Sequence, residues 1–345
     1  MPKVLTSRTN IRNLLIGVAV GSVCLATILR NVEIEQSWST LICLKARWIL
    51  LAVAISWASI LLRGWRWQRI FPVRSRPGFW RCLQVLAIGN MGNNLLPGRA
   101  GDLARCALIG RKVSVAASSE ALATLGVEKV VDGLALLGIV LFSMRLLTPP
   151  RWVWQLEAAS GVVFTGTLLL FLSLRLWTES VEAKIIRIGT YFGAPGLADR
   201  VAQLLKPFAG ELREINSARQ VTAIAAATSA IWFMEAALVW TLASSVSVPV
   251  TAASAAAVSA LIGLGFMIPA APAGLGTYEA FGVAAFKLVG IAASKGLAVT
   301  LLMHGLVFLA NNGLGLLSLG TAGWSFSQLR QGEQVTSTAG SGASS

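Results

Sequence analysis

Six charged residues stand out in two largely apolar stretches of the chain. They are Arg99, Asp102 and Arg105 in NNLLPGRAGDLARC (93–106), then Glu128, Lys129 and Asp132 in the segment 118–142. Guanidinium groups bind phosphate oxygens bidentately, and a half-helix beginning beside them would add its positive dipole. A helix would place Glu128 and Asp132 on one face. These residue types predict either recognition of an anionic headgroup or an ion-pair lock between the arginines and the later carboxylates, and the sequence leaves both interpretations open.

Five further polar residues interrupt apolar runs. Glu279 stands where a half-helix is expected to begin, so helix capping explains it as well as a functional role does. Glu235, inside IWFMEAAL, could couple transport to protons or bond a residue on another helix. His304, the only histidine, is expected to hydrogen-bond a neighbouring helix, because no metal-ligand spacing accompanies it. Asn90 and Asn94 could give a cavity a polar lining.

The composition predicts an all-α polytopic membrane protein. The 345 residues are 55% hydrophobic and 13% charged, with a mean hydropathy of +0.70, and soluble packing could not bury that much apolar surface. Several charge-free runs approach the length that crosses a hydrocarbon core, namely 13–29, 48–62, 82–98, 158–174, 220–234, 236–278 and 296–329. We expect about six to eight transmembrane helices in one membrane domain, residues 1–322, followed by a disordered tail, residues 323–345.

The arginine-rich segment 63–81 sets the expected orientation. It carries six arginines and no acidic residue, which is typical of a cytoplasmic loop. We therefore expect the N-terminus and the C-terminus on the cytoplasmic side, and a bacterial cytoplasmic membrane as the location. The net charge of +14 is explained by this topology, because the basic residues lie between apolar runs. No nucleic-acid partner is expected.

Two Pro-Gly breaks predict re-entrant hairpins. Pro97 and Gly101 interrupt the region 82–117, and Pro272 and Gly276 interrupt the region 253–293 at an offset of 175 residues. Non-helical backbone at membrane depth is tolerated only where it is buried in protein or faces a watery cavity.

The breaks also predict two repeat units. Each unit would consist of a span, a hairpin and a span, covering residues 47–143 and 221–319. One additional span at 157–176 would make the second unit inverted relative to the first. Inverted repeats with broken helices form the substrate sites of many transporters.

Four segments carry a resemblance to a known family. They are SWASILLRGWRWQRIF (56–71), NNLLPGRAGDLARCALI (93–109), EALATLGVEKVVDGLALL (120–137) and PAAPAGLGTYEAFGVAAF (269–286). In this order they resemble the lysylphosphatidylglycerol synthase transmembrane-region family, also called flippase-like membrane proteins. The family pattern falls on Pro97, Arg99, Gly101, Asp102, Arg105, Glu128, Lys129, Asp132, Pro272, Ala273, Gly274, Leu275, Gly276 and Glu279. Three positions depart from it: Asp102 replaces Glu, Lys129 replaces Arg and Ala273 replaces Gly.

The resemblance implies a membrane protein that moves or presents lipids or lipid-linked sugars. The soluble aminoacyl-transferase domain of bifunctional members is not expected here, so we expect no enzyme activity and no cofactor. Our first hypothesis is a translocase for an anionic phospholipid, a hopanoid or a polyprenyl-linked lipid, with membrane lipids as its partners. The alternative is a non-transporting accessory of a lipid-biosynthesis enzyme or glycosyltransferase. A membrane-embedded transferase is a third hypothesis, which the lack of an acid–base or metal constellation disfavours. The oligomeric state is left open.

Overall fold

The computed structural model describes residues 19–322 with internal gaps. The gaps are residues 29, 31, 43, 97–98, 111–114, 145–150, 192, 194, 200–201, 203–208, 211–212, 214–216 and 268–270. Three sequence predictions fall outside the described residues: the break at Pro97, the start of the first span, and the tail 323–345.

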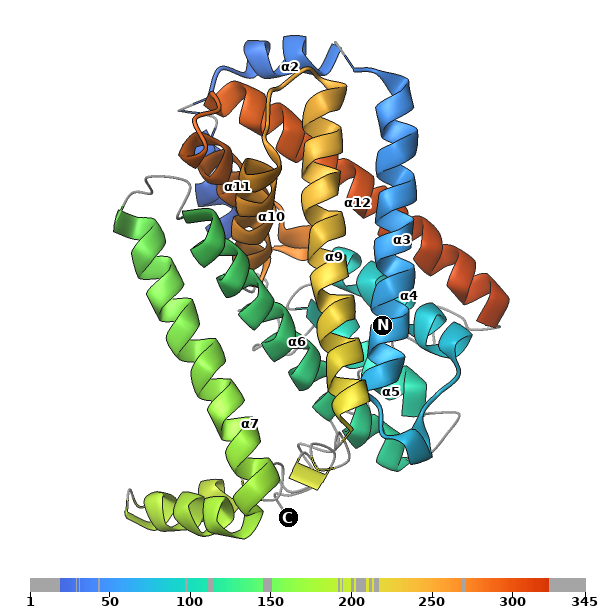
Figure 1. Ribbon diagram of the computed structural model, residues 1–345, viewed down its shortest axis with the longest axis vertical. Helices are drawn as coiled ribbons and strands as arrows, with labels where there is room; N and C mark the ends of the chain where they lie inside the picture. Colours follow the sequence, from blue (N-terminus) through green and yellow to red (C-terminus); the bar gives the residue numbers. More distant parts are fainter. Residues whose placement is uncertain are drawn as a thin grey trace, which may run out of the picture.

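The described part of the chain is all-α, as predicted, and contains no strand (Figure 1). Its helices are Ala19–Ile28, α2 (Ile34–Ile42), α3 (Ala46–Ile70), η2 (Val73–Ser75), α4 (Phe79–Leu95), α5 (Ala100–Gly110), α6 (Val115–Met144), α7 (Arg151–Tyr191), α9 (Ala218–Ser245), α10 (Ala252–Phe266), η4 (Pro272–Gly274), α11 (Thr277–Leu288) and α12 (Ala293–Ala322). By length and composition, four described stretches could cross a membrane: Ala46–Ile70, Val153–Leu170, Ala218–Ser245 and Ala293–Thr321.

Each predicted Pro-Gly break separates two packed half-helices. α4 packs against α5, and α10 packs against α11 across the short η4 turn. The two hairpins approach the middle of the bundle from opposite ends (Figure 1). The order of helix, hairpin and helix is therefore the same in residues 46–144 and 218–322. That these two units are inverted repeats stays a prediction.

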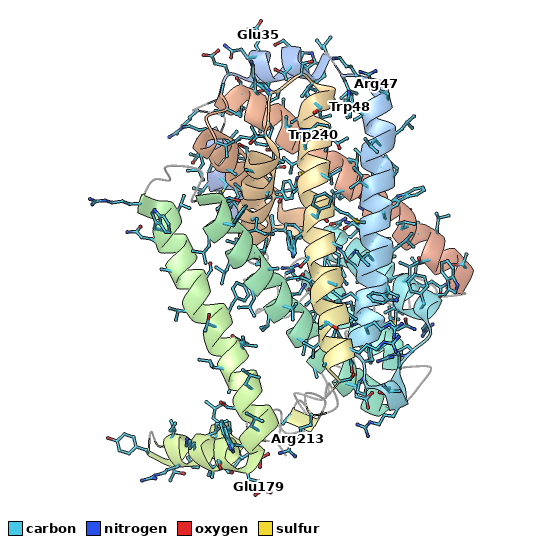
Figure 2. All side chains as sticks on the ribbon, viewed as in Figure 1. Glu35, Arg47, Trp48, Glu179, Arg213 and Trp240 are labelled. Carbon is cyan, nitrogen blue, oxygen red and sulfur yellow. The ribbon has the colours of Figure 1, made fainter. Side chains whose placement is uncertain are left out.

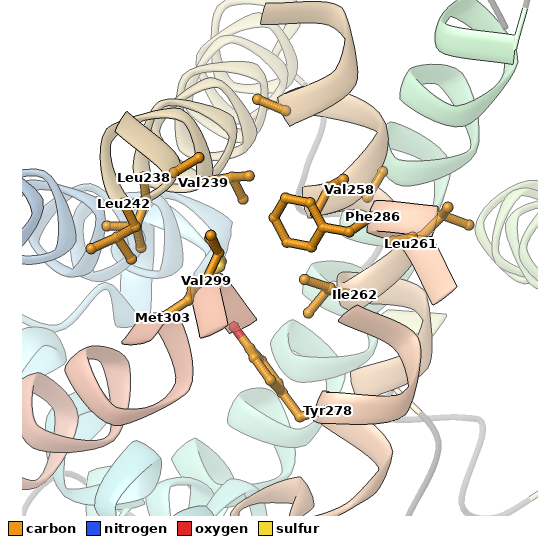
Figure 3. Packing of buried hydrophobic residues seen from close by; sticks show 14 of the residues in the cluster. Leu238, Val239, Leu242, Val258, Leu261, Ile262, Tyr278, Phe286, Val299 and Met303 are labelled. Atoms are coloured by element: carbon orange, nitrogen blue, oxygen red, sulfur yellow. The ribbon is translucent and has the colours of Figure 1, made fainter. Parts of the chain in front are cut away.

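The second hairpin is fixed by an apolar core. Side chains of α9, α10, α11 and α12 interdigitate in it, including Leu238, Val258, Phe286 and Val299 (Figure 3). These four side chains are all almost completely buried. Because close-packed interiors resist displacement, this core holds α10 and α11 firmly while their tip projects toward the first hairpin.

The two ends of the bundle differ in character. At one end Trp48 and Trp240 meet edge to face, with ring centroids 5.6 Å apart, and Arg47 lies beside them (Figure 2). Tryptophan is enriched at membrane interfaces. Toward the opposite end α7 kinks at Trp177, where the backbone leaves the helical region, and the segment after the kink turns aside from the bundle axis (Figure 1). The span predicted at 157–176 thus ends at the kink.

The predicted start of the arginine-rich loop is wrong. α3 continues through Arg63, Arg66 and Arg69 to Ile70, so these three arginines belong to the helix and not to a cytoplasmic loop. Arg66 can lie inside the bundle because two carboxylates of α6, Glu128 and Asp132, are within ion-pair distance of its guanidinium.

Gly101 allows the two half-helices of the first hairpin, α4 and α5, to pack closely. A β-carbon at this position would lie 1.9 Å from the carbonyl oxygen of Gly89 and 2.4 Å from the backbone nitrogen of Asn93. Both clashes are with backbone atoms, so α4 and α5 would have to separate. The small residue is therefore required by the packing of these half-helices.

We expect Gly101→Ala to lower the free energy of unfolding by about 1–3 kcal/mol, the usual range for overpacking. Thermal denaturation of the detergent-solubilised protein measures this. Gly138→Ala on α6 is the matched control, because nothing lies within 4 Å of its β-carbon. Equal melting temperatures for the two variants would contradict the packing argument.

Candidate functional site

A buried ion pair joins α3 to α6. Arg66 contacts Asp132 through two parallel bonds, Nη1 to Oδ1 at 2.5 Å and Nη2 to Oδ2 at 2.9 Å. The Arg66 side chain is 1% exposed. Thr228 and Trp232 of α9 complete the arrangement, since Arg66 donates to the Thr228 hydroxyl and the Trp232 indole donates to Asp132. Three helices are therefore tied together by one bidentate pair.

A second ion pair joins α5 to α6. Arg105 donates to Glu128 at 3.1 Å, and its guanidinium lies over the Trp67 ring, 4.9 Å from the centroid. The Arg105 side chain is 1% exposed. Glu128 also lies 3.9 Å from Arg66, so the two pairs form one continuous network.

Asp102 is the point where three cations converge. Its carboxylate lies 3.6 Å from Arg99, 3.7 Å from Arg105 and 3.4 Å from Lys129. Asn93 holds Asp102 in place by donating to the carboxylate and accepting from the Asp102 amide. The side chains of Arg99 and Lys129 are 27% and 34% exposed. Lys129 also lies 4.0 Å from Glu128. Arg99 and Lys129 therefore share the Asp102 carboxylate and remain accessible.

The tip of the first hairpin reaches the second. Arg99 has a φ of 56°, in the left-handed region that non-glycine residues rarely occupy. From this position its guanidinium donates to the carbonyl oxygen of Phe266 at 3.3 Å and lies 5.2 Å from the Phe266 ring centroid. Strained residues of this kind cluster at functional sites.

The tip of the second hairpin carries a histidine–carboxylate pair. His304 Nδ1 lies 2.5 Å from Glu279 Oε1, and His304 Nε2 lies 3.1 Å from the carbonyl oxygen of Ala273. The other Glu279 oxygen accepts from the Gly276 amide at 2.7 Å, which caps α11. Tyr278 stacks on the His304 ring at 4.5 Å. Glu279 thus both caps its helix and bonds α12.

The remaining predicted residues also have polar partners across helices. Glu235 of α9 accepts from Arg63 at 2.9 Å and from Ser59 at 3.0 Å, both on α3. The amide of Asn90 donates to Asn311 at 3.3 Å. Asn94 differs, because its buried side-chain nitrogen has no hydrogen-bond partner.

One cavity of about 210 Å³ gathers these groups. The predicted residues among its walls are Asn90, Asn94, Arg99, Asp102, Arg105, Glu128, Lys129, Asp132, Glu235 and His304. Eight of the described α-helices and the short η4 contribute to the walls, including the half-helices of both hairpins. The cavity therefore lies where the two hairpin tips meet. Glu279 is not in its wall but is bonded to His304, which is.

The structure changes some predicted pairings. Asp132 was expected to pair with Arg99 or Arg105, but its partner is Arg66, because α3 packs closer to it than the hairpin tip does. Arg66 itself was missed as a site residue, since it was assigned to a loop. A helix that continued beyond Arg63 would place Arg66, three residues later, on nearly the same face, and this spacing could have revealed it. Tyr278 and Asn93 were also missed as site residues. Gly101 and Pro272 shape the hairpins, and Gly276 both shapes its hairpin and donates its amide to Glu279.

The fold and the cavity define a class of helical membrane protein with two broken-helix hairpins that enclose a charged interior site. The family profile described as "Lysylphosphatidylglycerol synthase TM region" matches residues 14–315. The chain belongs to this family, as its motifs indicated. A search of curated proteins finds no match.

The residues described in the structure contain no group of three or more histidine, cysteine, aspartate or glutamate side chains arranged to hold a metal. What the site offers is charge and hydrogen bonding. The two accessible cations and the orphaned Asn94 amide are suited to the oxygens of an anion.

We expect Arg66→Met to lower the free energy of unfolding by about 3–5 kcal/mol, because Asp132 would be left buried without its counter-charge. The double variant Arg66→Met/Asp132→Leu should recover most of this loss, since no charge is then uncompensated. Thermal unfolding in detergent measures both. A double variant no more stable than the single one would show that the pair is not a self-contained lock.

Proposed function

We propose that this protein moves an anionic lipid between the leaflets of a membrane, with the headgroup passing through the cavity between the hairpin tips. One observation carries the proposal: Arg99 and Lys129 share the carboxylate of Asp102 while both remain exposed to the cavity. A lipid phosphate is the natural partner for such a pair of cations.

The charges around the cavity divide into a lock and a binding group. Arg66 with Asp132, and Arg105 with Glu128, are buried pairs that compensate each other. Asp102 then remains as the acid for both Arg99 and Lys129, which leaves one positive charge uncompensated in this group. This excess favours a ligand with one net negative charge. The two interpretations that the sequence left open thus apply to different arginines.

Headgroup binding would exchange one partner of Arg99. A phosphate that entered the cavity would replace Asp102 as the partner of the Arg99 guanidinium. Asp102 would still contact Asn93, Arg105 and Lys129. The unsatisfied Asn94 amide would donate to the same headgroup. Because Asp102 stays compensated, the exchange leaves no buried charge bare.

The cavity volume suits a headgroup and not a whole lipid. Pockets for drug-sized ligands measure roughly 300–1,000 Å³, whereas this cavity measures about 210 Å³. The acyl or polyprenyl chains would therefore stay in the bilayer while the headgroup crosses. A phospholipid, a hopanoid with an anionic head and a polyprenyl phosphate all satisfy this requirement.

We place the protein in the cytoplasmic membrane of a bacterium. The loop after α3 carries Arg74 and Arg76 between the helices that end at Ile70 and begin at Phe79, and basic loops face the cytoplasm. On this orientation the first hairpin enters from the cytoplasmic side and the second from the outside. Lipid binding and movement need no covalent step, so the proposal assigns no enzyme activity and no cofactor.

We expect Arg99→Ala to slow lipid movement roughly 10- to 100-fold, since a charge-assisted hydrogen bond contributes about 1.5–3 kcal/mol. Liposomes containing the purified protein and fluorescent phosphatidylglycerol, phosphatidylcholine or polyprenyl phosphate report movement through the fraction that an external quencher reaches. Arg99→Lys should retain part of the rate, because it keeps the charge. Arg74→Ala is the matched control, because Arg74 lies on the loop outside the cavity with its side chain 61% exposed.

The variants must elute as folded protein before the rates are compared. Full transport by Arg99→Ala would refute the assignment of Arg99 as the headgroup ligand. No movement of any lipid by folded wild-type protein would favour the alternative of a membrane accessory to a lipid-biosynthesis enzyme or glycosyltransferase, and capture of that partner would then be the next experiment.

A further inference from the structure

The hydrogen bond to Ala273 fixes one proton of His304. A carbonyl oxygen has no proton to give, so the 3.1 Å contact between His304 Nε2 and the Ala273 oxygen requires a hydrogen on Nε2. The neutral ring with this hydrogen carries a lone pair on Nδ1. That lone pair points to Glu279.

The contact between His304 and Glu279 then requires a second proton. Nδ1 and Oε1 lie 2.5 Å apart, and both would be acceptors if the ring were neutral and the carboxylate ionised. One proton must therefore lie between them, either as imidazolium with carboxylate or as imidazole with carboxylic acid. Loss of this proton would leave two lone pairs facing each other and would drive the two groups apart.

Both members of the pair are bonded to the tip of the second hairpin. His304 holds the Ala273 carbonyl, and Glu279 holds the Gly276 amide. Ala273 and Gly276 have φ values of 57° and 84°, in the left-handed region that is costly for alanine. Separation of His304 from Glu279 would release one of these two anchors, and the strained tip would change its position.

Aromatic contacts connect the pair to the proposed headgroup site. Tyr278 stacks on His304 and meets Phe266 edge to face at 6.0 Å. Phe266 in turn accepts the hydrogen bond of Arg99 through its carbonyl oxygen. A shift of the second tip is therefore transmitted to the guanidinium through three packed side chains.

Other charged groups line the same cavity, but they are paired with one another or with Arg66 and not with His304. Those that line it from α3, α5 and its preceding turn, α6 and α9 are Arg63, Arg99, Asp102, Arg105, Glu128, Lys129, Asp132 and Glu235. These groups form ion pairs with one another and with Arg66, as described above. Among the described residues, Glu279 is the carboxylate in ion-pair distance of His304.

We propose that His304 and Glu279 form a binding site for one transported proton, and that loading and unloading of this site moves the second hairpin tip and so couples lipid movement to a proton gradient. This inference rests on the proposed lipid translocation. It supplies the energy source that a chain without an ATP-binding motif would need for uphill movement.

The single histidine makes the proton directly observable. Full-length protein without a histidine tag, labelled with ¹⁵N-histidine and placed in lipid nanodiscs, gives nitrogen signals from His304 alone. Recorded over a pH series, the ring signals should show a hydrogen on Nε2 throughout and a proton toward Glu279 that is present in one state of the pair and absent in the other. A ring that holds one protonation state over the whole series would overturn the proposal.

Two isosteric variants separate this proton site from a structural hydrogen bond. In Glu279→Gln the side-chain oxygen still accepts from Gly276, but the amide donates to a neutral ring, so Nδ1 should hold no proton at any pH of the series. In Glu235→Gln, which changes another carboxylate near the cavity, the His304 titration should stay unchanged. An unchanged titration in Glu279→Gln would contradict the assignment.

Transport under a pH gradient tests the coupling. In liposomes with a difference of about two pH units across the membrane, wild-type protein should accumulate labelled lipid in one leaflet and acidify the lumen, which a trapped pH-sensitive dye reports. Nigericin, which dissipates the pH gradient, should abolish both effects. Glu279→Gln should lose the accumulation. Lipid movement that ignores the gradient would overturn the coupling and leave the translocation standing. No lipid movement at all would overturn the translocation and the coupling together, while the nitrogen titration alone decides the proton site.

Discussion

Charged side chains inside an apolar bundle must meet opposite charges, and the rest of this structure depends on that constraint. A charge at the centre of a membrane helix costs about 2.5–3.5 kcal/mol if it is left alone. The three charges in the middle of α6 are each met from a different position: Asp132 by Arg66 of α3, Glu128 by Arg105 of α5, and Lys129 by Asp102 of α5. The hairpin is thereby pinned to α6, and α6 to α3. Apolar packing, which is unspecific among leucines and alanines, could not set these positions so closely.

The same requirement explains why the two hairpin tips meet. A broken helix exposes carbonyl and amide groups at a depth where water is scarce, and each must find a partner. The Phe266 carbonyl finds Arg99, the Ala273 carbonyl finds His304, and the Gly276 amide finds Glu279. The second tip therefore takes two of these three partners, Arg99 and His304, from outside its own hairpin. Polar residues that appear functional in the sequence are, in part, the means by which irregular backbone is tolerated inside a membrane.

The helix order, both hairpins and the buried position of the α6 charges were predictable from the sequence, because charge-free runs and Pro-Gly breaks act locally. The partners were not. Arg66 was assigned to a loop, since a cluster of arginines after a span ordinarily marks the cytoplasm, and only the packing of α3 against α6 shows that it serves Asp132. Likewise, Glu235 has no mate within its own helix; its partner Arg63 comes from α3, 172 positions away. Pairings between distant segments depend on helix rotation and crossing, and neither is encoded in local periodicity.

Burial separates the structural charges from those available to a ligand. Arg105 and Arg99 differ by six positions and share Asp102, yet Arg105 is enclosed while Arg99, at the left-handed tip residue, keeps contact with the cavity. Exchange at Arg105 would break two carboxylate contacts and unmask Glu128. A ligand bound to Arg99 would replace only its 3.6 Å contact with Asp102, and Asp102 would still have Arg105 and Lys129 as counter-charges. The energetically accessible change therefore lies at the tip, and since the same guanidinium bonds the second hairpin, a ligand that takes Arg99 also alters the contact between the two halves of the protein. In the proposed function, this one side chain would link ligand binding to hairpin movement.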